Sequence, residues 1–117
     1  MLEDEELLRV TVSDILRGSG FDIREAATVA DAKRLLAKMP DIEVLFSDIR
    51  LPDGSGFELA KWCRDVRPHV RILLTSGSYH GPIDGFSVLP KPYPVVTLLA
   101  LLKQLLSRRR LGLDRSK

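Results

Sequence analysis

The chain has 117 residues, of which 44% are hydrophobic and 29% are charged, so it can bury the core of one compact domain. Its longest apolar run, Leu98 to Leu102, is far shorter than the roughly 20 residues that span a bilayer. The acidic residues after Met1-Leu2 are unlike a cleavable signal, and the single cysteine, Cys63, excludes an internal disulfide. We therefore expect a cytoplasmic protein.

The two parts of the chain differ in charge. Residues 1–65 hold 14 Asp and Glu against 9 Lys and Arg, whereas residues 66–117 hold 2 against 9. Five of the later cations gather at the end of the chain, as Arg108, Arg109, Arg110, Arg115 and Lys117. Cations at a helix end complement the helix dipole. We therefore predict a domain over residues 1–107 with a basic tail over residues 108–117, and no direct binding to nucleic acid or membrane.

Turn residues and apolar periodicity divide the chain into alternating helices and strands. Thr28 with Asp31, and Ser55 with Glu58, have the spacing of helix-capping pairs. The predicted helices cover residues 5–19, 28–38, 55–67 and 94–109, and the predicted strands cover residues 21–26, 42–46, 70–74 and 86–89. Residues 79–85 contain two Gly, a Pro and an Asp, which predicts a loop.

Strands that alternate with amphipathic helices predict an α/β fold, with a doubly wound parallel sheet covered on both faces. In such sheets, ligands bind at the carboxyl ends of the strands. Asp48, Thr75 and Lys91 follow predicted strands, and Glu3 and Asp4 precede the first helix. Carboxylates suit Mg²⁺, and a hydroxyl and a lysine beside it can bind phosphoryl oxygens. Asp48 would then be a nucleophile that forms an aspartyl phosphate.

The order of these residues resembles the receiver domain of bacterial two-component response regulators, over roughly residues 2–106. Residues 45–56, Leu-Phe-Ser-Asp-Ile-Arg-Leu-Pro-Asp-Gly-Ser-Gly, are similar to the phosphoacceptor segment of that family. Residues 73–77 and 89–93 resemble its next two motifs. The segment 89–93, Leu-Pro-Lys-Pro-Tyr, is also similar to receivers attached to hybrid histidine kinases.

The resemblance implies a phosphorelay role for the acidic residues. Asp48 would accept a phosphoryl group from a histidine kinase or a histidine phosphotransfer protein. Asp4, Asp48 and the backbone carbonyl of Arg50 would ligate Mg²⁺, and Glu3 would act through a metal-bound water. The implied activity is that of a signalling module, not of an enzyme that turns over a metabolite.

The same resemblance implies the remaining roles and the fold. Lys91 would contact the phosphoryl oxygens, Thr75 would move toward them as a switch, and the Lys91–Pro92 bond would be cis. The sheet would have five parallel strands in the flavodoxin-like order 2-1-3-4-5.

Three departures from the family pattern stand out. Only Met1-Leu2 remain of the first strand, which normally lies at the centre of the sheet. Only 15 residues separate Thr75 from Lys91, which predicts that the fourth helix is shortened or replaced by a loop. Val88 stands where the family usually has an aromatic switch residue.

These departures leave a degenerate receiver, acting through protein contacts without phosphate, as the main alternative. A haloacid-dehalogenase-type phosphatase needs an acid two residues after the nucleophile, where this chain has Arg50. A flavin-binding domain needs a phosphate-binding loop after the first strand, where this chain has acids.

The last predicted helix is more apolar than docking on a sheet requires. Nine of the twelve residues 95–106 are apolar, whereas a docked helix needs about three to four in two turns. Apolar surface beyond what docking on the sheet requires is typical of an interface with another polypeptide. We therefore expect a homodimer through this helix, through the open sheet edge, or through both, unless the shortened fourth-helix region covers the surplus leucines.

Overall fold

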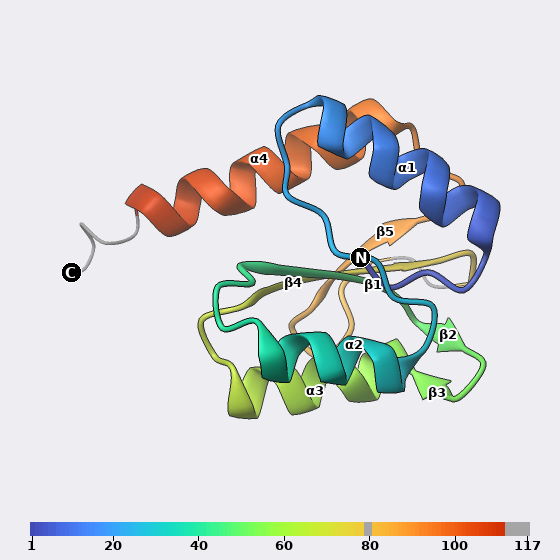
Figure 1. Cartoon of the computed structure of the whole chain (residues 1–117), viewed down its shortest axis with the longest axis vertical. Helices are drawn as coiled ribbons and strands as arrows, with labels where there is room; N and C mark the ends of the chain where they lie inside the picture. The colour runs from blue at the N-terminus through green and yellow to red at the C-terminus, as the bar shows by residue number, and fades with distance from the viewer. Residues whose placement is uncertain (79–80, 112–117) are drawn as a thin grey trace.

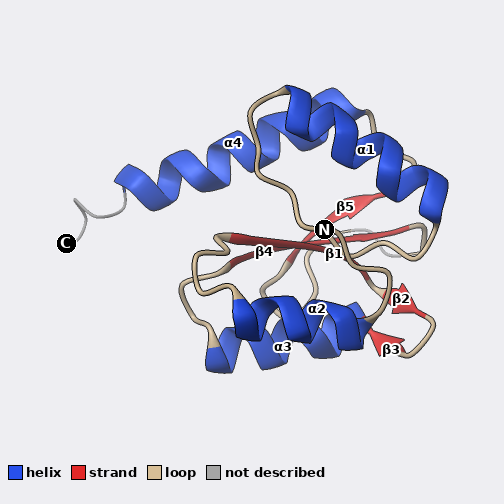
Figure 2. Cartoon of the chain, viewed as in Figure 1, coloured by secondary structure: helices blue, strands red, loops and turns tan. Residues whose placement is uncertain are grey.

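The computed structural model describes residues 1–78 and 81–111, which form a parallel sheet with helices on both faces (Figure 1). The predicted α/β class is therefore confirmed. The helices are α1 (Glu6–Gly18), α2 (Val29–Lys38), α3 (Gly56–Val66) and α4 (Val95–Leu111). The strands are β1 (Val44–Asp48), β2 (Arg50–Leu51), β3 (Gly54–Ser55), β4 (Arg71–Ser76) and β5 (Ser87–Pro90). Figure 2 shows α1 and α4 on one side of the sheet and α2 and α3 on the other.

The main sheet has three parallel strands in the order β1-β4-β5. In this register Asp48 of β1 lies beside Thr75 of β4, and Thr75 lies beside Leu89 of β5. The carboxyl ends of the three strands therefore meet at one edge. The short β2 and β3 pair separately as an antiparallel hairpin, which the sequence analysis did not predict.

Leu2 occupies the position of the predicted first strand. It forms parallel bridges to Ala26 on one side and Ser47 on the other. Its N–H donates to the Phe46 carbonyl at 2.8 Å, and its carbonyl accepts from the Asp48 N–H at 2.9 Å. The order Ala26, Leu2, β1, β4, β5 thus follows the predicted 2-1-3-4-5 order, with single residue pairs in place of two strands.

The core lies in two layers because neighbouring residues of a strand point to opposite faces. On the face covered by α2 and α3, Leu45 packs with residues of these helices, including Leu36 and Leu59. On the face covered by α1 and α4, Phe46 packs with residues that include Leu16 and Leu98. The buried Cys63 packs in the same cluster as Leu45.

Local sequence explains where two helices begin. The Thr28 hydroxyl accepts from the Asp31 N–H at 3.1 Å and caps α2. The Ser55 hydroxyl accepts from the N–H groups of Phe57 and Glu58 and caps α3. Both capping predictions are confirmed.

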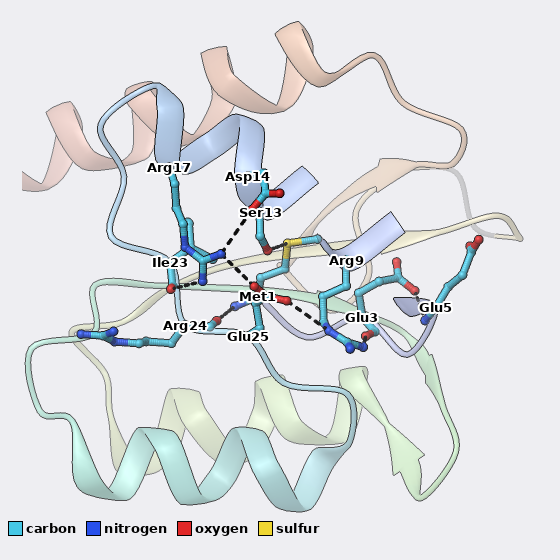
Figure 3. A network of polar contacts seen from close by, with 10 residues as sticks. All are labelled: Met1, Glu3, Glu5, Arg9, Ser13, Asp14, Arg17, Ile23, Arg24 and Glu25. Atoms are coloured by element: carbon cyan, nitrogen blue, oxygen red, sulfur yellow. Dashed lines mark hydrogen bonds and ion pairs between the residues drawn. The ribbon is translucent and has the colours of Figure 1, made fainter. Parts of the chain in front are cut away.

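The prediction of a strand over residues 21–26 is wrong for most of its length, because only Ala26 forms a bridge. A strand needs a partner backbone, and the segment has one only at Met1 to Glu3. Side chains of α1 hold it instead (Figure 3). Arg17 donates to the Ile23 carbonyl at 2.8 Å, and the Glu25 carboxylate lies between Arg9 and Arg17 at 3.3 and 2.9 Å.

A loop replaces the fourth helix of the family. Residues 77–78 and 81–86 form bends and turns with one bridge, between Ile83 and Phe86, and no helix. Phe86 fills the space against Ile49, Ala60 and Leu74. The expectation of a shortened or absent fourth helix is thus confirmed for the described residues, and residues 79–80 lie outside them.

The last helix, α4, continues past residue 107 to Leu111, so the predicted basic tail begins within it. Residues 112–117 of that tail lie outside the described residues. Within residues 1–78 and 81–111, no helix is long and apolar enough to cross a membrane.

Candidate functional site

The carboxyl edge of the sheet gathers the predicted site residues. Asp48 ends β1, its neighbour in register is Thr75, and Lys91 directly follows β5. The Lys91 N–H donates to the Ser76 carbonyl at 2.9 Å, which fixes the start of the loop after β5. The Lys91–Pro92 peptide bond is cis, as predicted.

Three acids form a cluster at this edge. Glu3, Asp4 and Asp48 each offer a carboxylate oxygen, and these oxygens lie within 4.8 Å of one another. Glu3 and Asp48 are buried, whereas Asp4 is exposed. A compact set of hard oxygen donors with one solvent-facing member suits Mg²⁺, which keeps some of its water ligands. The donor set therefore fits the predicted ion.

Lys91 neutralises part of the negative charge of the cluster. Its Nζ lies 2.7 Å from Glu3 Oε1 and 2.6 Å from Asp48 Oδ1. Burial alone would lower the pKa of Lys91, but its hydrogen bonds to Asp48 and Glu3 raise it above its ordinary value. The side chain therefore stays cationic between the two carboxyl groups.

The two buried acids differ in their affinity for protons. Burial and the neighbouring Glu3 raise the pKa of Asp48 to about 7, against the opposing effect of Lys91. Burial alone would also raise the pKa of Glu3. Hydrogen bonds with Asp48, with Lys91 and from the Glu5 N–H lower it instead. Of the pair, Asp48 is thus the carboxyl group that binds a proton more readily when no metal ion is present.

Thr75 is buried beside Asp48, and its hydroxyl donates to the Leu89 carbonyl at 2.7 Å. This bond points the hydroxyl toward β5 in the present conformation. Val88, in the family's aromatic position, is half-buried and packs with the cluster around Phe86.

Residues 1–103 match the response regulator receiver domain family. The chain belongs to this family. It is a receiver domain, homologous to the phosphoacceptor domains of response regulators and hybrid kinases.

Individual relatives agree with this assignment. The sensor kinase CckA of Brucella abortus is 25% identical over 117 residues, which cover 93% of this chain and 12% of that protein. The response regulator PilR of Pseudomonas aeruginosa is 28% identical over 118 residues, covering 93% of this chain and 26% of that protein. The crystal structure of the receiver domain from the hybrid histidine kinase CckA matches with a TM-score of 0.78 and 30% identity, covering 90% of this chain and 94% of that one. The chain spans a minor part of the length of these two curated relatives.

The loop after Asp48 depends on Gly56, eight residues further along the chain. The Gly56 N–H donates to the Ile49 carbonyl at 2.8 Å, so the backbone turns back against the end of β1. A Cβ at Gly56 would lie 1.8 Å from the Asp48 carbonyl oxygen and 2.7 Å from Ser47 Oγ. Only glycine fits this close approach without a backbone shift.

The hairpin after Asp48 carries a contact that sequence reasoning missed. Arg50 begins β2 with an exposed side chain. At the turn, the Asp53 carboxylate accepts from the N–H groups of Val29 and Ala30 at 2.8 and 3.1 Å. These hydrogen bonds lower the pKa of Asp53 and tie the hairpin to the start of α2. No local pattern joins residues so far apart in the sequence.

Tyr93 is a second residue that the sequence analysis did not place at the site. Its ring packs edge-on against Phe46, with 5.8 Å between ring centroids. Burial, and then the charge of Glu3, raise the pKa of its hydroxyl to about 12. The neutral hydroxyl is buried and has no hydrogen-bond partner among the described residues.

Proposed function

We propose that the receiver accepts a phosphoryl group on Asp48 and holds Mg²⁺ beside it. The observation that carries this proposal is the position of Asp48, buried at the end of β1 with a second carboxyl group and a lysine beside it. An oxygen of the Asp48 carboxylate bonds to phosphorus while the bond from phosphorus to the donor breaks, and the donor keeps that electron pair. The donor class is a phosphohistidine of a kinase or a phosphotransfer protein.

Asp4, Asp48 and the Arg50 carbonyl would hold the ion, and Glu3 would act through one of its waters. Bound Mg²⁺ supplies positive charge for the oxygens of the phosphoryl group and favours the ionised form of Asp48. Lys91 already pairs with Asp48, and its ammonium group is available to the phosphoryl oxygens once the charge moves there. Thr75 Oγ1 would exchange its bond to the Leu89 carbonyl for one to the phosphoryl group.

The alternative of a degenerate receiver is not favoured, because the fold brings together all the side chains that the reaction needs. Leu2, in the position of the first strand, bonds to Phe46 and Asp48, and the residues that follow it, Glu3 and Asp4, reach the site. The substitution at Val88 affects the neighbourhood of Thr75 and leaves the acids and Lys91 in place.

Intact-mass measurement after incubation with Mg²⁺ and acetyl phosphate tests the proposal. We expect a mass increase of one phosphoryl group, which Asp48→Asn abolishes. The matched control is Asp65→Asn, an exposed carboxylate on α3, which should be modified like the parent chain. Full modification of the Asp48→Asn chain would refute the assignment.

We further propose a homodimer through α4. Leu98 and Leu102 are buried against the sheet, while Leu99, Leu101 and Leu105 are only partly covered. Val96 is 71% exposed on the same helix. The apolar surface that remains is therefore available to a second copy.

A further inference from the structure

The position of Asp4 in the acidic cluster depends on the backbone that carries it. Asp4 is exposed, and it lies in the short connection between Glu3 and the start of α1. Within the described part of the chain, the side chain of Glu5, the N-cap residue of α1, makes no capping hydrogen bond. Another contact is therefore needed to fix this connection, so that Asp4 and Asp48 can bind the same ion.

Arg9, in the second turn of α1, makes that contact (Figure 3). Its Nη1 donates to the Glu3 carbonyl at 2.9 Å. The Glu3 N–H donates to the Ala26 carbonyl at 3.0 Å, so both backbone polar groups of Glu3 are bonded. Because the peptide unit is planar, a fixed Glu3 carbonyl also fixes the position of the Asp4 Cα. Arg9 thus determines where the chain places Asp4.

Arg9 is itself held by Glu25. Its Nε lies 3.3 Å from Glu25 Oε1, and the two side chains are only 16% and 24% exposed. The donors of a guanidinium form a rigid fork, so one side chain can bond a carboxylate and a carbonyl at the same time. Glu25 balances the charge of Arg9. The contribution of Arg9 to Glu3 is therefore a hydrogen bond in a fixed direction.

Position and charge make opposite predictions for the effect of Arg9 on a metal ion. A guanidinium near Mg²⁺ repels it, because both are cations. If charge were decisive, removal of Arg9 would strengthen Mg²⁺ binding. If position is decisive, removal frees the Glu3 carbonyl, and the affinity falls because Asp4 no longer keeps a fixed distance from Asp48. The sign of the change in affinity therefore separates the two effects.

We propose that Arg9, held by Glu25, is a positioning residue of the Mg²⁺ site that keeps Asp4 within reach of the ion bound by Asp48. This inference rests on the proposed function, because it requires the ion to bind at these two acids. Hydrogen-bonding partners orient metal ligands, and their replacement typically weakens metal binding by about 10-fold to 100-fold. Arg9 acts on the residue before a ligand, so we expect a loss of about tenfold.

A titration of the isotope-labelled 117-residue chain with Mg²⁺, followed by its amide signals at constant ionic strength, tests the proposal without a phosphodonor. We expect Arg9→Gln to bind Mg²⁺ about tenfold more weakly than the parent chain. Glu25→Gln should weaken binding less, because Arg9 keeps its bond to the Glu3 carbonyl. The matched control is Arg17→Gln, which removes the other cation from the Glu25 carboxylate and should bind Mg²⁺ like the parent chain.

Hydrogen exchange of the metal-free chain gives a second readout. The Glu3 N–H bonds to the Ala26 carbonyl, and the Glu5 N–H bonds to Glu3 Oε2 at 3.0 Å. Both amides should exchange faster in Arg9→Gln, because the connection before α1 opens more often, and at the parent rate in Arg17→Gln.

Arg9→Lys serves if the glutamine variant fails to fold. Lysine keeps the positive charge, but it lacks the rigid fork that bonds Glu3 and Glu25 together. This variant should therefore also bind Mg²⁺ more weakly than the parent chain, although the net charge is unchanged.

Several results would overturn the positioning role. Tighter Mg²⁺ binding by Arg9→Gln would assign the effect to charge, and parent-like binding by both Arg9 variants would remove the effect. An equal loss of affinity in Arg17→Gln would assign it to the segment 21–26 as a whole. Weaker binding with unchanged exchange at Glu3 and Glu5 would also contradict it. A parent chain that binds no Mg²⁺ would refute the proposed metal site itself, and this inference with it.

Discussion

Replacing Asp48 by Asn should stabilise the receiver at high pH but much less at low pH. Asp48 is 4% exposed and shares a buried site with Glu3, which is why its pKa is raised from 3.8 to about 7. A carboxyl group with a raised pKa keeps its proton longer in the folded state than in the unfolded state. The free energy of unfolding therefore falls as pH rises from about 4 through about 7.

The size of this change in stability follows from the pKa of Asp48, which is about 7 in the folded state and has the ordinary value of 3.8 in the unfolded state. Between pH 5 and pH 8, ionisation of Asp48 should cost the folded state about 2.5 kcal/mol relative to the unfolded chain. The lowered pKa of Glu3 acts below this range, and the raised pKa of Lys91 acts above it. Burial lowers the pKa of the Met1 amine to about 6, but this contribution is common to both chains and cancels in their difference.

Urea unfolding of the parent chain and Asp48→Asn, at pH 5 and pH 8 with a chelator present, measures this effect. The stability advantage of the variant should grow by about 2–3 kcal/mol between the two pH values. Asp65→Asn, which removes an exposed carboxylate, should show no such growth. An advantage of Asp48→Asn that is the same at both pH values would show that the buried pair does not hold the proton as described.

Three further substitutions have expected outcomes. Mg²⁺ should raise the melting temperature, and Asp4→Ala should remove most of that rise in a thermal scan, because Asp4 is the solvent-facing donor of the cluster. Gly56→Ala should destabilise the fold by ~3 kcal/mol in chemical denaturation, because the added Cβ would meet the Asp48 carbonyl. A denaturation midpoint equal to that of the parent chain would contradict this expectation. Leu101→Glu should reduce the mass measured by light scattering at high micromolar concentration, and a parent chain that is strictly monomeric there would refute the dimer.

Local chemistry made much of the fold predictable. The caps at Thr28 and Ser55 are set by residues three positions apart, so their hydrogen bonds could be anticipated from the sequence. Parallel strands have their carboxyl ends at one edge of the sheet, and this geometry places Asp48, Thr75 and Lys91 close together. These features depend on short spacings or on the fold class alone.

Contacts between distant segments could not be predicted in this way. The alternating pattern of residues 21–26 is typical of a strand, but the pairing depends on a partner backbone, and Met1 to Glu3 bond only to Arg24 and Ala26 of this segment. The bond from Asp53 to α2 and the position of Tyr93 at the site are likewise products of tertiary packing. The small β2–β3 hairpin was missed because its two-residue strands carry no periodic signal.

Backbone bonds on both sides of Leu2 hold the acidic edge of the sheet together. The Leu2 carbonyl accepts from the Asp48 N–H, and the Glu3 N–H donates to the Ala26 carbonyl, so Glu3 and Asp48 approach each other on a fixed backbone. A change of charge at this edge should therefore move side chains rather than the backbone, and the Asp48 amide should exchange its hydrogen slowly.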